Sequence, residues 1–441
     1  MSTLQTTNSG KSSGQYVYQM AMIALLFFIF GFVTWLNGTL IPFLKLACEL
    51  KTDTQAYLVA TAFYMAYFFL AIPSSKILER TGFKNGMALG LLVMAAGALV
   101  FIPAAYTRNF GVFLTGLFIQ GAGLSLLQTA SNPYVSIIGP IESAARRISI
   151  MGIANKVAGA LSPLVLGALV LKNASALEEQ VKNAPTDAVR ADLLDELAQR
   201  VIGPYAVMAV VLLLLAAFIR RSNLPNIDSE ADLEGDATTA SNKTSVLQFK
   251  HLILGAFTIF FYVGAEVMAG DIISTYGKNL GFSLDQTKYF TTFTLIAMLG
   301  GYVLGIIAIP KYISQQKSLR WAAILGILFT FGAVFTDGTT SVTFVALLGL
   351  ANAPMWPAIF PLGIRKLGKF TKIGSALMIM GIAGGAIIPL LYGKLSETIP
   401  FQTAFLVIML FCYAYILFFS VRGYRAGFKK KEREDEEEVL A

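Results

Sequence analysis

Long apolar stretches alternate with short polar segments along most of the chain. A helix needs about 20 mostly apolar residues to cross the hydrocarbon core of a bilayer, and roughly twelve stretches meet this requirement. The predicted spans cover residues 18–44, 55–78, 85–106, 110–138, 148–171, 201–220, 250–277, 287–310, 318–336, 341–363, 370–393 and 402–420. The pattern therefore predicts an all-α membrane protein.

The polar segments divide the predicted spans into two sets of six. Residues 221–249 are rich in Ser, Thr, Asp and Asn, which is typical of a linker between two helical bundles. A second polar segment, residues 172–200, mixes acids and bases and predicts a short amphipathic helix or loop on the outer side of the membrane. The predicted domains are an N-terminal cytoplasmic tail (1–17), a six-helix bundle (18–220), a cytoplasmic linker (221–249), a second six-helix bundle (250–420) and a C-terminal cytoplasmic tail (421–441).

A short repeat relates the two sets of spans. The sequence IMGIA at residues 150–154 recurs at residues 379–383, and small residues, a proline and an apolar run ending in glycine follow each copy. The first copy opens the fifth predicted span, and the second lies in the eleventh. A duplication of this kind predicts two pseudo-symmetric six-helix bundles with a site between them near the membrane midplane, which is the layout of a transporter.

Composition and charge agree with a membrane protein. Of the 441 residues, 56% are hydrophobic and only 14% charged, whereas about 25% are charged in a soluble protein. The net charge of +8 arises from Lys and Arg in one set of connections, among them Lys76, Arg80, Lys84, Arg146 and Arg147. Because basic loops stay in the cytoplasm, both termini are predicted to be cytoplasmic, and the positive charge needs no nucleic acid partner. We expect a monomer in a lipid bilayer.

Several classes of function are disfavoured by missing motifs. The sequence has no phosphate-binding loop, no nucleophile elbow and no His-rich metal motif, which argues against an ATP-driven pump and against an enzyme. One histidine and two cysteines give no basis for a metal cluster or a structural disulfide, so we expect no cofactor. The residues that could carry chemistry are polar side chains inside apolar spans, where burial without a partner costs about 2–7 kcal/mol.

Amides inside the spans predict contacts with a substrate rich in hydroxyl groups. Gln128 and Asn132 lie four residues apart and share one helix face, and Asn352 and Trp356 have the same spacing. Amides can hydrogen-bond the hydroxyls of a sugar, while an indole stacks on its apolar ring face. The alternative is that the amides hold helices together and that Trp356 packs against a helix or lipid. The candidate substrate-binding residues are Asn37, Gln128, Asn132, Asn155, Asn352 and Trp356.

Three charged side chains inside the spans are candidates for cation coupling: Lys156, Glu266 and Asp271. An unpaired ammonium in a membrane loses its proton or finds a carboxylate, and Glu266 is the candidate partner of Lys156. Three alternatives remain at this point. Glu266 takes up a proton while its pairing with Lys156 breaks and reforms, or Na⁺ binds near Glu266 or Asp271 through oxygen ligands, or Lys156 acts as a built-in cation and transport is uncoupled.

The segment 128–134, QTASNPY, followed by Gly139, Pro140, Arg147 and Asn155, resembles the major facilitator superfamily, specifically its fucose/glucose–galactose:proton symporter family. Residues 262–266 and 360–364 extend the resemblance into the second half. The resemblance implies the fold of that superfamily and import of a hexose-type sugar across the bacterial cytoplasmic membrane by alternating access, with proton symport as the first expectation. The alternatives are a Na⁺-coupled symporter, an uncoupled uniporter, and, in a different class, a membrane sugar sensor that does not transport.

The resemblance also implies a gate. Residues 77–82, ILERTG, resemble the superfamily's loop between helices 2 and 3. Glu79 and Arg80 are therefore expected to latch the cytoplasmic side when the outer side is open.

The chain departs from the fucose permease pattern at the positions linked to coupling. That pattern has an aspartate where this chain has Gly38, and a glutamate where it has Gln128. Lys156 replaces a small polar residue, and Glu266 replaces a glutamine. The coupling mechanism of the family therefore does not carry over residue by residue.

Overall fold

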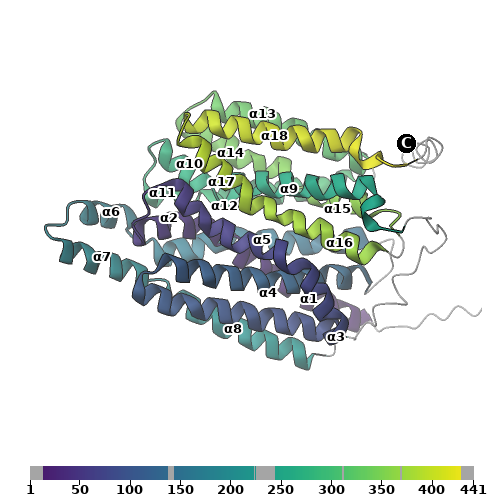
Figure 1. Cartoon of the computed structure of the whole chain (residues 1–441), viewed down its shortest axis with the longest axis horizontal. Helices are drawn as coiled ribbons and strands as arrows, with labels where there is room; N and C mark the ends of the chain where they lie inside the picture. The colour runs from purple at the N-terminus through teal and green to yellow at the C-terminus, as the bar shows by residue number, and fades with distance from the viewer. Residues whose placement is uncertain are drawn as a thin grey trace, which may run out of the picture.

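The computed structural model describes residues 13–137, 144–222, 224, 244–309, 312–367 and 370–428. Within these residues it contains helices and turns but no strand. The helices of the first half of the chain lie together along one side of the molecule, and those of the second half lie along the other side (Figure 1). The arrangement agrees with the all-α membrane protein predicted from the apolar pattern.

The first half contains α1 (Ser13–Thr34), α2 (Asn37–Ala47), α3 (Asp53–Thr107), α4 (Phe110–Ile137), α5 (Ala144–Val170), α6 (Ala174–Lys182), α7 (Asp187–Gln199) and α8 (Ile202–Arg221). The second half contains α9 (Lys250–Gly270), α10 (Ile273–Asn279), α11 (Leu284–Thr287), α12 (Phe290–Ala308), α13 (Gln315–Val334), α14 (Gly338–Asn352), α15 (Met355–Ile364), α16 (Thr371–Met380), α17 (Gly384–Ser396) and α18 (Phe401–Val421). Short 3₁₀ turns are η2 (Val246–Gln248), η4 (Gly381–Ala383) and η5 (Gly423–Arg425).

Among the described residues, 11 helical segments are long and apolar enough to cross a membrane. One of them, α3, has 55 residues and contains both the second and the third predicted span. It turns at Gly82, where φ is 73° and ψ is 167°, a conformation that glycine adopts without steric cost. Because α3 holds two spans, all twelve predicted spans are present. Most of the predicted linker and both tail ends lie outside the described residues.

Four of the predicted spans are divided into shorter helices. The first divides between α1 and α2, the seventh between α9 and α10, the tenth between α14 and α15, and the eleventh at η4. The apolar pattern predicts where the chain crosses the membrane but does not show these interruptions. Pro354, which precedes α15, has no backbone N–H to continue the hydrogen bonding of α14. The first and seventh spans open the two halves, and divided helices in transporters surround the substrate site.

Equivalent pairs of helices in the two halves cross at similarly close distances. In α1, a Cβ at Gly31 would lie 1.8 Å from the backbone oxygen of Asn155 in α5. In α17, a Cβ at Gly384 would lie 1.7 Å from the backbone oxygen of Phe260 in α9. Only glycine allows the backbones to approach this closely. The pairs join the first span to the fifth and the seventh to the eleventh, as a duplication requires.

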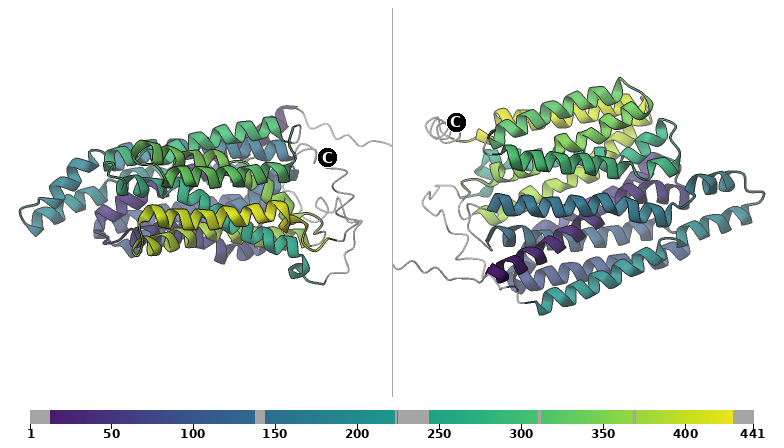
Figure 2. Two further views of the ribbon diagram at one scale, coloured as in Figure 1. Left: turned by 90° about the horizontal axis from the view of Figure 1, so that it is seen from above. Right: turned by 180° about the vertical axis from the view of Figure 1, so that it is seen from behind.

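The helices α6 and α7 form a hairpin that extends past the other helices at one end of the molecule (Figures 1 and 2). We call this the hairpin end, and we call the opposite end, where α1 begins and α18 ends, the terminal end. The hairpin occupies residues 172–200, for which the sequence predicted a short helix or loop.

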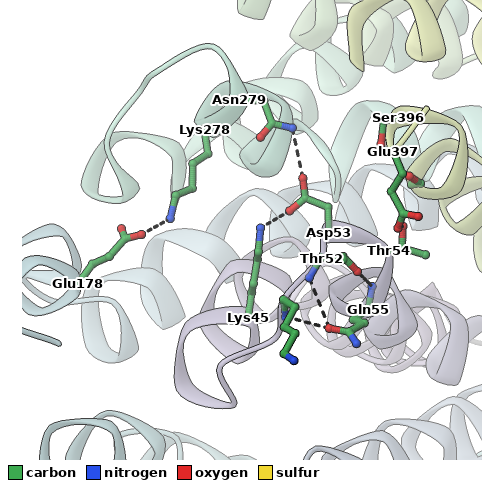
Figure 3. Close-up of polar contacts among 12 residues, drawn as sticks. Lys45, Thr52, Asp53, Thr54, Gln55, Glu178, Lys278, Asn279, Ser396 and Glu397 are labelled. Atoms are coloured by element: carbon green, nitrogen blue, oxygen red, sulfur yellow. Dashed lines mark hydrogen bonds and ion pairs between the residues drawn. The ribbon is translucent and has the colours of Figure 1, made fainter. Parts of the chain in front are cut away.

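Polar contacts join the two halves at the hairpin end (Figure 3). Lys278 donates to Glu178 over 2.5 Å, Asn279 donates to Asp53 over 3.3 Å, and the Thr54 hydroxyl donates to Glu397 over 2.7 Å. The Ser175 and Asp285 backbone amides each donate to the side chain of the other residue, over 3.1 and 3.2 Å. We call this set the hairpin-end contacts: Glu178–Lys278, Asp53–Asn279, Thr54–Glu397 and Ser175–Asp285.

Candidate functional site

A cavity of about 140 Å³, with charged, amide and aromatic side chains in its wall, lies between the two halves. Both halves supply its walls, so movement of one half against the other would change its shape. The first half contributes Trp35, Tyr64, Tyr67, Gln128, Asn155 and Lys156, and the second half contributes Tyr262, Glu266, Tyr302 and Trp356.

An ion pair crosses the cavity from one half to the other. The Lys156 ammonium donates to Glu266 Oε1 over 2.9 Å, and the two side chains are only 9% and 13% exposed. The ammonium also lies 4.6 Å from the centre of the Trp35 ring, within the range of a cation–π interaction. The expected pairing of Lys156 with Glu266 is confirmed, and it places both charges where neither is isolated in the membrane.

Two predicted amides line the same cavity. Gln128 in α4 donates to the Tyr67 hydroxyl over 3.0 Å, and Asn155 in α5 donates to the Phe27 backbone oxygen over 3.3 Å. These bonds hold each amide in a fixed orientation at the cavity wall. A substrate hydroxyl that enters the cavity therefore meets oriented polar groups from two helices.

Aromatic rings form the rest of the wall. Trp356 stacks on Phe360, with ring centres 5.7 Å apart and an interplanar angle of 18°, and its centre lies 6.3 Å from that of Tyr262. Trp35 approaches from the first half. Sequence reasoning did not select Trp35, Tyr64, Tyr67 or Tyr302, because aromatic residues are common in membrane spans. The proximity of Trp35 to Asn37 in sequence was the one available signal.

Three predicted amides lie away from the cavity lining or outside the described residues. Asn352 is fully buried, and its Oδ1 accepts a hydrogen bond of 2.9 Å from the Tyr413 hydroxyl. Asn37 is also buried, and neither of its side-chain polar atoms has a partner among the described residues. Asn132 belongs to α4, but its side chain lies outside the described residues.

The predicted common face of Asn352 and Trp356 was wrong. Asn352 is the last residue of α14, and Trp356 lies in α15 beyond Pro354. The interruption separates the two environments, so that Asn352 packs against α18 while Trp356 lines the cavity. Their spacing of four residues indicates a shared face only within one continuous helix.

Asp271 follows the last residue of α9 and is fully buried. The Tyr64 hydroxyl donates to its Oδ2 over 3.3 Å, across the interface of the halves, and its Oδ1 has no hydrogen-bond partner among the described residues. Tyr64 also lines the cavity. Asp271 is therefore adjacent to the cavity wall but does not belong to it.

The remaining predictions concern the gate and a metal ion. Glu79 and Arg80 are exposed residues of α3, just before the turn at Gly82, and their gating role stays a prediction. In the part of the chain that the structure describes, no three His, Cys, Asp or Glu residues gather in a way that could hold a metal ion. A Na⁺ site near Glu266 or Asp271 stays a prediction.

The fold and the site agree with known proteins. The model of the Major Facilitator Superfamily matches residues 23–383. The chain therefore belongs to this superfamily, whose members are membrane transporters rather than enzymes.

Individual relatives within the superfamily span almost the whole chain. The glucose/galactose transporter of Brucella abortus biovar 1 (strain 9-941) is 35% identical over 416 residues, which cover 93% of this chain and 95% of the relative. The L-fucose-proton symporter of Escherichia coli (strain K12) is 30% identical and is covered to 94%, with 93% of this chain covered. The crystal structure of the transporter FucP in the outward conformation has a TM-score of 0.69 at 27% identity, and the match covers 92% of this chain and 98% of that one.

Proposed function

We propose that the chain imports a hexose across the bacterial cytoplasmic membrane by proton symport, with the cavity opening to the two sides in turn. The observation that carries this proposal is the cavity between the halves, in whose wall the Lys156–Glu266 ion pair joins one half to the other. The relatives named as glucose/galactose transporters and L-fucose-proton symporters support a hexose and a proton.

The cavity wall has the chemistry that a hexose needs. Gln128 and Asn155 offer amide groups to hydroxyls, and Trp356 and Trp35 offer ring faces to the apolar side of a pyranose. The Lys156–Glu266 pair adds a donor and an acceptor at the centre. Charge-assisted hydrogen bonds are stronger than neutral ones, so a hydroxyl bound there would compete with the ion pair itself.

Lys156, Glu266 and Asp271 are assigned to cation coupling. The Lys156–Glu266 pair connects the two halves, so it separates when they move apart at the cavity. Separation leaves two charges in a poorly solvated place, which is costly unless a proton or a ligand compensates. Bound sugar and a bound proton together would supply that compensation. The transport of sugar would thereby be coupled to the transport of a proton.

The hairpin end corresponds to the outer side. Arg220 and Arg221 close α8 at the terminal end, and basic residues mark the cytoplasmic side, where both chain termini then lie. The hairpin-end contacts hold the halves together at the outer side, as expected when the cavity is closed to the outside. The protein acts as a monomer, because each chain supplies both walls of the cavity.

The test is uptake by purified protein in proteoliposomes, with labelled D-glucose, D-galactose and L-fucose and with pH and Na⁺ gradients imposed separately. We expect accumulation of at least one sugar when the pH gradient alone is applied. Accumulation driven by Na⁺ alone would replace the proton by Na⁺ as the coupling ion. Exchange without accumulation under either gradient would indicate a uniporter, and binding without exchange would indicate a sensor.

A further inference from the structure

The buried carboxyl of Asp271 has surroundings unlike those of Glu266, five residues before it on the same span. Glu266 is in an ion pair with Lys156 at 2.9 Å. Asp271 receives one hydrogen bond from the Tyr64 hydroxyl, faces the Gly38 backbone amide, and keeps Oδ1 without a partner among the described residues. The two carboxyls therefore differ in what can stabilise a negative charge.

The charged groups that face Asp271 are Glu266 and Lys156. Glu266 repels a second negative charge, and the Lys156 ammonium is already bonded to Glu266. Trp35 is in contact with both Lys156 and the end of α9, since a Cβ at Gly270 would lie 2.2 Å from Trp35 Cζ3. An ionised carboxylate that is fully buried without a cation is strongly disfavoured. A neutral carboxylic acid at Asp271 avoids the cost of a buried charge and keeps only the smaller cost of a buried polar group.

We infer that Asp271, rather than Glu266, binds the proton that moves with the sugar, an inference that rests on the proposed function. Oδ1 takes one proton from the outer solution when the hairpin end is open, and the carboxylate becomes a carboxylic acid. The proton leaves Oδ1 for water in the cavity once the cavity opens to the cytoplasm, and the carboxylate returns. One proton is carried inward for each cycle, and Glu266 remains the charge partner of Lys156.

Asp271 lies between the hairpin-end contacts and the cavity wall. This position allows its carboxyl to take up a proton from one side of the membrane and release it to the other. On one side, α10 begins two residues after Asp271 and ends with Lys278 and Asn279, whose hairpin-end contacts join the halves. On the other side, the Tyr64 hydroxyl bonds to Asp271 and lies at the cavity wall. Tyr64 is thus a positioning residue, which holds Oδ2 and leaves Oδ1 for the proton.

The first test compares Asp271→Asn with Glu266→Gln in proteoliposomes, with labelled D-glucose and D-galactose as probes. A gradient of one pH unit corresponds to about 1.4 kcal/mol and supports up to about tenfold accumulation at one proton per sugar. In Asp271→Asn, the ratio of accumulation to sugar counterflow is expected to fall toward that of an uncoupled carrier, and sugar no longer draws protons into the vesicles. In Glu266→Gln, transport slows, but proton uptake per sugar transported persists. Wild-type accumulation by Asp271→Asn, or proton uptake lost only in Glu266→Gln, would overturn the inference.

A second readout does not depend on transport. Infrared difference spectra of the full-length protein in lipid report the C=O stretch of a protonated carboxylic acid. This band is expected in the wild type and in Glu266→Gln and is expected to be missing in Asp271→Asn. If the Asn variant does not fold, Tyr64→Phe replaces it: loss of its hydrogen bond shifts the band, whereas Tyr67→Phe, whose hydroxyl accepts from Gln128, leaves the band in place. A band that is still present in Asp271→Asn, or whose frequency does not shift in Tyr64→Phe, would contradict the assignment.

The failure of this inference and the failure of the proposed function give different results. A wild-type protein that exchanges none of the three hexoses contradicts the proposed function, while the infrared band still decides whether Asp271 holds a proton. Sugar accumulation that only Na⁺ drives leaves transport intact and overturns the role of Asp271 as proton carrier.

Discussion

The Lys156–Glu266 pair in the cavity and the Glu178–Lys278 pair at the hairpin end connect the same two halves of the molecule, yet their surroundings differ. The side chains of Lys156 and Glu266 are 9% and 13% exposed, whereas those of Lys278 and Glu178 are 36% and 38% exposed. An exposed pair contributes about 0–1 kcal/mol, but breaking a buried pair by removal of one partner costs about 3–5 kcal/mol. The hairpin end is thus closed by several contacts that each contribute little, whereas loss of one partner of the cavity pair leaves a buried charge at a large cost.

The difference indicates a division of roles between the two regions. Contacts that are individually weak and partly hydrated can separate and reform within a transport cycle without a large barrier. The cavity pair separates only when another group takes the place of a partner, and a hydroxyl of the bound sugar can do so. Sugar binding and translocation are therefore expected to depend on the cavity pair, and the rate of opening on the hairpin-end contacts.

The largest effect is expected from removal of one partner of the cavity pair. Lys156→Ala leaves Glu266 without its cation in a buried place, so the variant is expected to lose about 3–5 kcal/mol of stability and uphill uptake with it. Thermal unfolding in detergent and uptake in proteoliposomes measure the two losses. The double variant Lys156→Ala/Glu266→Ala removes both charges and should regain much of the stability. A single variant as stable as the wild type would show that Glu266 without its cation carries no large burial penalty.

A smaller effect is expected from the walls of the cavity. Trp356→Ala removes a ring face that packs on Phe360 and borders the cavity, so sugar affinity should fall by about 1–3 kcal/mol, or about fivefold to 150-fold. Trp321→Ala is the matched control, since Trp321 is exposed on α13 and does not line the cavity. The concentration of D-glucose or D-galactose that half-saturates counterflow is the measurement. An equal shift in both variants would contradict a role for Trp356 in binding sugar.

The sequence predicted these two regions to different degrees. The apolar stretches predicted every span, because membrane burial depends on local hydropathy alone. The charge pair Lys156–Glu266 could also be predicted, since an isolated charge in a span needs a partner. The hairpin-end contacts could not be predicted from the sequence, because they depend on how α6 of the first half and α10 of the second half lie against each other. The environment of Asp271 was equally hidden: its distinction from Glu266 arises from Tyr64 and from the break after α9.

A modest effect is expected from Lys278→Ala at the hairpin end. The change removes the bond to Glu178 and should weaken closure by about 0–1 kcal/mol, or up to about fivefold in the balance between closed and open states. Spin labels placed on exposed residues of α7 and α13 would report the distance between the halves. Arg190→Ala is the control, because Arg190 pairs with Glu49 inside the first half. A closed fraction that changes equally in both variants would contradict a specific role of the Glu178–Lys278 contact.

The smallest effect is expected from pH at Glu397, which lies just beyond α17 at the hairpin end. The Lys394 ammonium, and then the Thr54 hydroxyl, hold the pKa of the Glu397 carboxyl below its ordinary value. The contact of Thr54 with Glu397 as acceptor is therefore fully present above the ordinary pKa of about 4.3 and is lost as pH falls through the lowered pKa. Acid on the hairpin side should thus favour opening slightly. The same spin-label distances, followed from neutral to acidic pH, should show this trend in the wild type and a weaker one in Glu397→Gln, whose side chain does not titrate. An identical pH profile in both would assign the trend to other carboxyls, such as Asp53, which pairs with Lys45 and accepts from Asn279.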